Sequence, residues 1–186
     1  MRQWLACLFV MQLSAAAFAA PVSLPLQRAG STVSFTAHTK LFDVTGTFQQ
    51  WRGTLVLDRE NLTASKVTVE VDVDTLDTGI NARDEHVRGE DFLHTATHKK
   101  ATFVSREVQV GGPAGIVVVG DLTIRGVTKR VSVPIELADL NGKVHATGKL
   151  QLNRFDYGVN YKASLLTPAV APEVELTFVF QFAPGA

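Results

Sequence analysis

Apolar and polar residues alternate along most of the chain. In residues 65–75, SKVTVEVDVDT, every second residue from 67 to 73 is a valine, and charged or hydroxyl-bearing residues fill the positions between. The same period of two recurs in RVSVPIEL, KVHATGKLQLN and EVELTFVFQF. Such alternation predicts β-strands with one dry face and one solvated face. We expect about eight strands, at residues 31–39, 43–57, 64–75, 101–110, 116–125, 128–138, 143–154 and 173–182.

Short turn signals separate these predicted strands. Asn141-Gly142 predicts a two-residue hairpin turn, and Gly126-Val127 fits a turn with glycine at its first central position. Gly111-Gly112-Pro113 ends the strand at 101–110. Tight turns between neighbours indicate an antiparallel meander, which is interrupted at residues 80–94 and at the Pro-containing segment 155–172.

The predicted strands can hide their apolar faces in a sandwich or in a closed barrel. Several of them are about ten residues or longer, roughly 33 Å when extended, and this length favours the barrel. Many inward positions carry small residues, which indicates an interior that side chains do not fill. The side chains expected to line that cavity are Phe35, Val69, Val71, Phe103, Leu122, Phe178 and Phe180, with Phe92 from the segment at 80–94.

The first twenty residues have the pattern of a secretory signal peptide. Arg2 precedes an apolar run from Trp4 to Leu13, and Ala17-Phe18-Ala19 fits the small-x-small cleavage site. The run is too short for a membrane anchor, and Cys7 lies too near the start for a lipoprotein cysteine. We expect cleavage near Ala19-Ala20, a single domain at residues 21–186, and a periplasmic protein.

Composition removes several classes of function. Lys and Arg number 18 against 18 Asp and Glu, so no basic excess attracts nucleic acid. Cys7 is the one cysteine and leaves with the signal peptide, which excludes thiol catalysis and cysteine-bound metals. No nucleophile motif is present and the carboxylates lie on wet strand faces, so we expect no enzyme activity and no cofactor.

Residues 80–94, INARDEHVRGEDFLH, concentrate charge between two strands. Asn81 fits a helix N-cap and Gly89 a helix stop, which predicts a short helical insertion within residues 81–94 at one end of the barrel. One interpretation is a lid: Val87, Phe92 and Leu93 face inward, while exposed ion pairs of Arg83, Asp84, Glu85 and Arg88 tie the lid to the rim.

Two other interpretations of this segment remain open. Arg83 and His86 are candidates for holding a ligand head group, because guanidinium binds phosphate or carboxylate well. Alternatively His86, His94 and His98 hold zinc or copper, with His94 and His98 spaced as on one face of a helix. His38 and His145 alternate with apolar neighbours and are expected to face solvent.

Several motifs resemble the YceI family over residues 22–182. The most specific are Asp77-Thr78-Gly79, the RDEH run at 83–86 and GDLTIRGVTK at 120–129, followed by FDYGVNY and VELTFVFQF near the end. The resemblance implies an all-β, extended, lipocalin-like antiparallel barrel of eight strands. It also implies a long apolar cavity for a polyisoprenoid or similar chain. The family's acidic stretch ending in Tyr-Pro is missing from residues 93–100.

These observations together predict a periplasmic binding protein. It would sequester or carry an amphiphilic apolar chain, of the polyisoprenoid, isoprenoid quinone or fatty-acyl type, in a barrel cavity. The alternative is a metal- or redox-linked accessory protein that uses the three histidines. We expect a lipid-like partner, no nucleic acid and no membrane-spanning segment in the mature chain. A homodimer stays open.

Overall fold

The structure is a computed structural model that describes residues 20–140, 142–161 and 169–184. The predicted signal peptide at residues 1–20 lies outside these residues except for Ala20. The strands are β1 (Val22–Thr39), β2 (Asp43–Phe48), β3 (Trp51–Leu57), β4 (Lys66–Asp72), β5 (Leu76–Asp77), β6 (Lys100–Val110), β7 (Ile116–Ile124), β8 (Val127–Leu140), β9 (Lys143–Asn153) and β10 (Val170–Phe182). The helical elements are α1 (Asn81–Arg88) and the single-turn segments η1 (Leu62–Ala64), η2 (Val73–Thr75) and η3 (Arg154–Tyr157).

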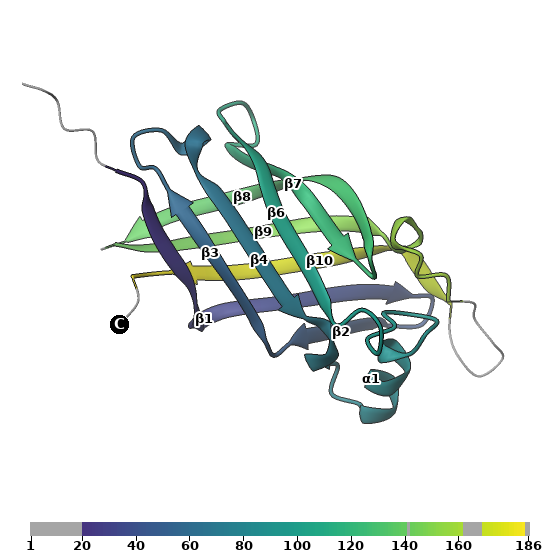
Figure 1. The fold of residues 1–186 in the computed structure, drawn as a ribbon. Coiled ribbons are helices and arrows are strands. Elements are labelled where there is room, and N and C mark those ends of the chain that lie inside the picture. The colour runs from purple at the N-terminus through teal and green to yellow at the C-terminus, as the bar shows by residue number, and fades with distance from the viewer. Residues whose placement is uncertain (1–19, 141, 162–168, 185–186) are drawn as a thin grey trace, which may run out of the picture.

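The strands form a closed antiparallel barrel (Figure 1). From β10 the sheet runs through β9, β8, β7, β6, β4 and β3 to β1, and β1 pairs back onto β10. β1 is long enough to pair with β3 through its first residues and with β2 through its last. The predicted eight-stranded barrel is therefore confirmed, with β2 and β5 as short additions at one end.

Three predicted strand boundaries were wrong. The first strand begins at Val22 rather than residue 31, because it continues through a bulge at Gly30, whose φ is +78°. The predicted strand at 43–57 divides at Gln49, where the Thr75 hydroxyl and carbonyl take the backbone N–H groups of the bend. The last strand begins at Val170, inside the segment predicted as a loop.

The turns explain the antiparallel order. The turn after β7 is Arg125-Gly126, not Gly126-Val127, and both residues have positive φ, as a type I′ turn requires. Leu140 pairs with Lys143 across the predicted turn at 141–142; residue 141 lies outside the described residues. Gly111 closes its hairpin by donating its N–H to the Gly115 carbonyl.

The helical insertion covers one end of the barrel (Figure 1). α1 ends before Gly89, as predicted, but Asn81 is its first helical residue rather than the N-cap. The cap position is Ile80, and no side chain caps the helix there. Within the described residues no helix is long and apolar enough to cross a membrane.

Candidate functional site

Two neighbouring chambers, which share several lining residues, occupy the interior of the barrel. The narrow chamber lies at the end where β1 begins and β10 ends, and its volume is about 160 Å³. The wide chamber lies at the α1 end, and its volume is about 400 Å³. One buried water needs about 10–15 Å³ on such a scale, so each chamber exceeds an ordinary packing defect. The interior is a cavity large enough for a guest.

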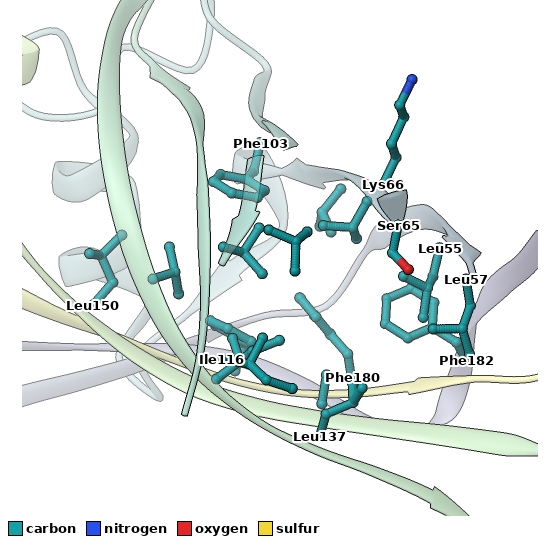
Figure 2. A pocket seen from close by; sticks show the side chains of 18 of the residues that line it. Leu55, Leu57, Ser65, Lys66, Phe103, Ile116, Leu137, Leu150, Phe180 and Phe182 are labelled. Atoms are coloured by element: carbon teal, nitrogen blue, oxygen red, sulfur yellow. The ribbon is translucent and has the colours of Figure 1, made fainter. Parts of the chain in front are cut away.

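Apolar side chains from nearly every strand form the narrow chamber (Figure 2). Leu55 and Leu57 of β3 meet Phe182 of β10 at its outer end, beside the fully buried Leu24 and Val144. The nitrogen of Lys66 points away from this space in Figure 2. A guest in this chamber therefore meets hydrocarbon on most sides.

Every side chain predicted to line the cavity does line it. Phe178 and Phe180 line the narrow chamber, while Phe35, Val71 and Phe92 line the wide one. Val69, Phe103 and Leu122 line both. The period of two found the strand residues among them because the pleat sends alternate side chains to one face, and Phe92 was predicted from the segment at 80–94. That they contact a ligand stays a prediction.

Glycines give three of these phenyl rings room against the wall. A Cβ on Gly46 would lie 2.5 Å from the Phe35 ring. The same distance separates a Cβ on Gly120 from the Phe103 ring and a Cβ on Gly148 from the Phe178 ring. Each glycine thus lets an inward ring lie where a side chain would otherwise push it into the lumen. This packing keeps the cavity open despite its aromatic lining.

Polar side chains enter the lining mainly at the α1 end. Arg83 and His86, the predicted head-group candidates, both line the wide chamber. The sequence missed Arg154, Tyr157 and Tyr161, which line the same chamber. Among the described residues no aspartate or glutamate lines either chamber. The wide chamber is therefore the end suited to a polar or anionic head group.

Hydrogen bonds, rather than the predicted ion pairs, hold α1 in place. Asp84 is only 5% exposed, and its carboxylate accepts the Thr78 backbone N–H at 2.9 Å and the Thr78 hydroxyl at 2.6 Å. Arg83 donates to the same hydroxyl and to the Thr78 carbonyl, both at 2.8 Å. The RDEH run therefore fastens the helix to the Asp77-Thr78-Gly79 loop.

Arg88 completes the attachment of the helix. Its guanidinium donates to the carbonyls of Asp74 and Leu76 at 2.8 and 2.6 Å. Its distance to the Asp74 carboxylate is 3.9 Å, which is the loosest of the ion pairs. The lid prediction was right about the residues that anchor the helix, apart from Glu85, and wrong about the kind of contact.

An aromatic cluster closes part of the α1 end. The Phe92 ring stacks on Tyr161 with centroids 4.5 Å apart, and His86 meets both rings edge-on. This cluster joins the helical insertion to the segment after η3. His86 itself is exposed, so it lies at the mouth rather than deep in the chamber.

Arg154 supports the irregular wall of the wide chamber. Its guanidinium is buried and donates to the carbonyls of Val159, Ala171, Val170 and Tyr161 at distances from 2.6 to 3.4 Å. Burial lowers the pKa of this guanidinium from its usual value, although arginine stays charged in proteins. One side chain thus ties the segment at 159–161 to the start of β10.

Tyr157 brings a polar atom into this wall without a partner. The residue is 3% exposed, and within the described part of the chain its hydroxyl has no hydrogen-bond partner. Burial, with a smaller contribution from the Asp156 charge, raises the pKa of Tyr157 to about 12. The hydroxyl therefore stays neutral across the physiological range.

The structure disfavours a three-histidine metal site. His94 and His98 lie together with ring centroids 5.7 Å apart, but His86 packs against Phe92 and Tyr161 instead. Across residues 20–140, 142–161 and 169–184, no three His, Cys, Asp or Glu side chains gather in a way that could hold a metal ion. The 94–98 segment forms turns rather than a helix and still brings His94 and His98 together, so the position of His86 is what breaks the predicted set of three.

The other two histidines have different surroundings. His38 lies near the end of β1 and pairs with Asp43 across the hairpin, 2.8 Å apart and half-exposed, as expected for a solvent-facing residue. His145 of β9 pairs with Ala138 of β8 and with Gln181 of β10, and it lines neither chamber. Neither residue belongs to the cavity.

Comparison with known proteins agrees with this architecture. The family model described as YceI-like domain matches residues 25–182. A UPF0312 protein of Shewanella sp. strain ANA-3 is 34% identical over 189 residues, which cover 97% of each chain. Protein YceI of Escherichia coli O6:H1 is 38% identical over 119 residues, 60% of this chain and 62% of that protein.

Solved structures share the barrel. The crystal structure of Burkholderia cenocepacia BcnA superposes with a TM-score of 0.78 at 26% identity, covering 84% of this chain and 98% of that one. A polyisoprenoid binding domain from Saccharophagus degradans gives a TM-score of 0.71 at 20% identity, covering 88% and 99%. With the family match over most of its length, the chain belongs to the YceI-like domain family.

Proposed function

We propose that the protein binds an amphiphilic molecule with a long apolar chain and sequesters or carries it in the barrel. The observation that carries the proposal is a pair of neighbouring apolar chambers, with the cationic side chains of α1 and η3 in the lining of only one of them. Hydrocarbon surrounds the narrow chamber, while Arg83, His86 and Arg154 line the wide one. A ligand whose apolar tail lies in the narrow chamber and whose polar head group lies in the wide chamber fits this arrangement.

The energetics of burial suit this role. Each buried methylene contributes about 0.8 kcal/mol, so ten of them contribute about 8 kcal/mol before the cost of ordering the guest. Few polar contacts are then needed for useful affinity. The chemistry fits a polyisoprenoid, an isoprenoid quinone or a fatty-acyl chain, since each joins methylene-rich tail to a small polar head.

The relatives support the same class of ligand. The Saccharophagus degradans domain that shares this fold binds polyisoprenoids according to its description. The family is described as a YceI-like domain, and the sequence carries no nucleophile turn of the G-x-S-x-G kind. We therefore propose binding rather than catalysis.

The expected location follows from the N-terminal segment. A signal peptide at residues 1–20 would export the chain to the periplasm, where an apolar ligand needs protection from water. A role as a soluble carrier between membranes would follow from that location.

Native mass spectrometry of protein purified from its own host tests this function. We expect a bound molecule whose mass corresponds to a lipid, quinone or isoprenoid, and its release by mild organic solvent. A bare protein mass, together with no uptake of an apolar fluorescent probe, would contradict the proposal. The same experiment with a chelator checks the histidines: loss of bound zinc or copper would revive the metal interpretation.

A further inference from the structure

The two chambers meet at a belt of five residues. The side chains that line both chambers are Val33, Val69, Phe103, Leu122 and Leu176, and we refer to them as the waist. Val69 pairs with Phe103 and Phe103 with Leu122 across β4, β6 and β7, so these three form one row on one wall. Val33 of β1 and Leu176 of β10 complete the waist.

Phe103 is the largest side chain of the waist. In Figure 2 its ring lies at one side of the narrow chamber, away from Leu57 and Phe182 at the outer end. The ring rests against the backbone of Gly120, where a Cβ would come within 2.5 and 2.6 Å of two ring carbons. Contacts below 3.0 Å do not occur at real Cβ atoms, so any side chain at 120 would displace the ring.

We propose that Phe103, held against Gly120, determines how long a chain the protein accepts. A tail that stays in the wide chamber does not meet the waist, whereas a longer tail must pass the Phe103 ring to bury its end in the narrow chamber. The pair therefore acts on chain length and leaves head-group binding unchanged. This inference rests on the proposed function, since it assigns a specificity-determining residue within the same cavity.

Linear alcohols of increasing length test the inference on the whole protein. Octanol, dodecanol and hexadecanol compete with an apolar fluorescent probe, and each competition gives an affinity. For the natural chain we expect affinity to rise by roughly fourfold for each methylene buried. In Gly120→Ala the displaced ring blocks the waist. Octanol then binds as before, while hexadecanol gains nothing over dodecanol.

Gly46→Ala provides the matched control. Gly46 supports the Phe35 ring with the same 2.5 Å geometry, but Phe35 lines only the wide chamber. This control should weaken the binding of all three alcohols by a similar factor, and affinity should still rise with chain length. The contrast between a loss for long chains and a uniform loss separates the waist from the cavity as a whole.

A second variant keeps the test valid if Gly120→Ala folds poorly, since a Cβ there would also approach the Val104 carbonyl at 2.7 Å. Val69→Phe adds a ring to the waist from the neighbouring strand and leaves Gly120 unchanged. We expect the same plateau with chain length. An undiminished rise from dodecanol to hexadecanol in folded Gly120→Ala or Val69→Phe would overturn the inference. Failure of all three alcohols to bind the natural chain would overturn the proposed function itself.

Discussion

The walls of the narrow and wide chambers differ in their secondary structure. Regular strands make most of the narrow chamber, with side chains such as Val67, Val133 and Phe180 at alternate positions, and η1 adds Leu62. The wide chamber adds α1, η3 and the segment after η3 to its strand wall, and the cationic side chains come from these irregular parts or next to them. The alternation of side chains along strands is enough to line a space with hydrocarbon. The cationic side chains of the wide chamber, by contrast, come from backbone that leaves the sheet.

Irregular backbone in the wall of the wide chamber carries an energetic cost. Carbonyls that leave a sheet must find other donors. Arg154 donates to the carbonyls of Val159 and Tyr161 in the irregular segment and of Val170 and Ala171 at the start of β10. Arg83 and Arg88 donate to carbonyls beside α1. The arginines at this end therefore support the wall first, and a head group would meet cations that are already fixed.

The largest effect is expected at the support of the irregular wall. Arg154→Met should lower the free energy of unfolding by roughly 3 kcal/mol, because several partly buried carbonyls lose their donor. Urea denaturation measures this change. Arg52→Met removes an arginine whose side chain is 73% exposed and should cost less than about 1 kcal/mol. Equal losses in the two variants would contradict a special role for Arg154.

Filling either chamber should separate their contributions to binding. Val71 and Val67 lie on the same face of β4, one in the wide chamber and one in the narrow. Val71→Trp should weaken every apolar ligand by roughly 100-fold, the contribution of three to four buried methylenes. Val67→Trp should weaken the binding of long-chain ligands only.

Circular dichroism must show that both tryptophan variants fold, and probe competition then gives the affinities. An unchanged affinity in folded Val71→Trp would show that ligands bind outside the wide chamber. Equal losses for short and long chains in Val67→Trp would remove the distinction between the chambers.

A smaller effect is expected where the helix joins the sheet. Asp84→Ala removes the acceptor of two hydrogen bonds from Thr78, and we expect a loss of about 2 kcal/mol of stability. Glu85→Ala, the exposed neighbour, should change stability by less than about 0.5 kcal/mol. Hydrogen exchange at α1 measures the local effect. Equal protection in both variants would argue against Asp84 as the anchor.

The smallest expected effect is an increase in stability rather than a loss. Tyr157→Phe removes a buried hydroxyl that has no partner, so we expect about 1 kcal/mol of added stability near neutral pH. The raised pKa also predicts a pH dependence. The usual tyrosine pKa is about 10 and the folded value is about 12, so the folded state holds a proton that the unfolded state releases.

The contribution of the protonated Tyr157 to the free energy of unfolding is therefore fully present below about pH 10. It declines as the pH rises toward about 12. Tyr157→Phe should lack this part of the decline, which thermal unfolding between those limits would show. A variant less stable than the natural chain at neutral pH would mean that the hydroxyl does have a stabilising contact.

The sequence predicted the strand wall well and the irregular wall poorly. Alternation identified the predicted cavity residues on the strands, because a strand sends every second side chain to the same face, whereas Phe92 was predicted from the segment at 80–94. It missed Arg154, which continues the alternate positions of Leu150 and Leu152 at the end of the predicted strand 143–154, and it could not place Tyr157 or Tyr161, which follow no period. The FDYGVNY motif was the available signal, but its neighbourhood was interpreted only as a loop.

The same contrast holds for the charged segment at 80–94. Its helix was predicted from Gly89 and the run before it, whereas the contacts of Asp84 and Arg83 with Thr78 depend on a fold that no local pattern specifies. The histidine interpretation failed for the same reason. His94 and His98 do lie together, but His86 packs against Phe92 and Tyr161, and no local spacing specifies that contact.

A crystal structure with a long-chain alcohol that carries bromine at the end of its tail tests the central claim most directly. Anomalous scattering locates the bromine without ambiguity. We expect one peak in the narrow chamber, beyond Phe103 and near Leu57, with the hydroxyl among the polar side chains of the wide chamber. A bromine on the outer surface of the barrel, or at the α1 end with the hydroxyl in the narrow chamber, would contradict the account.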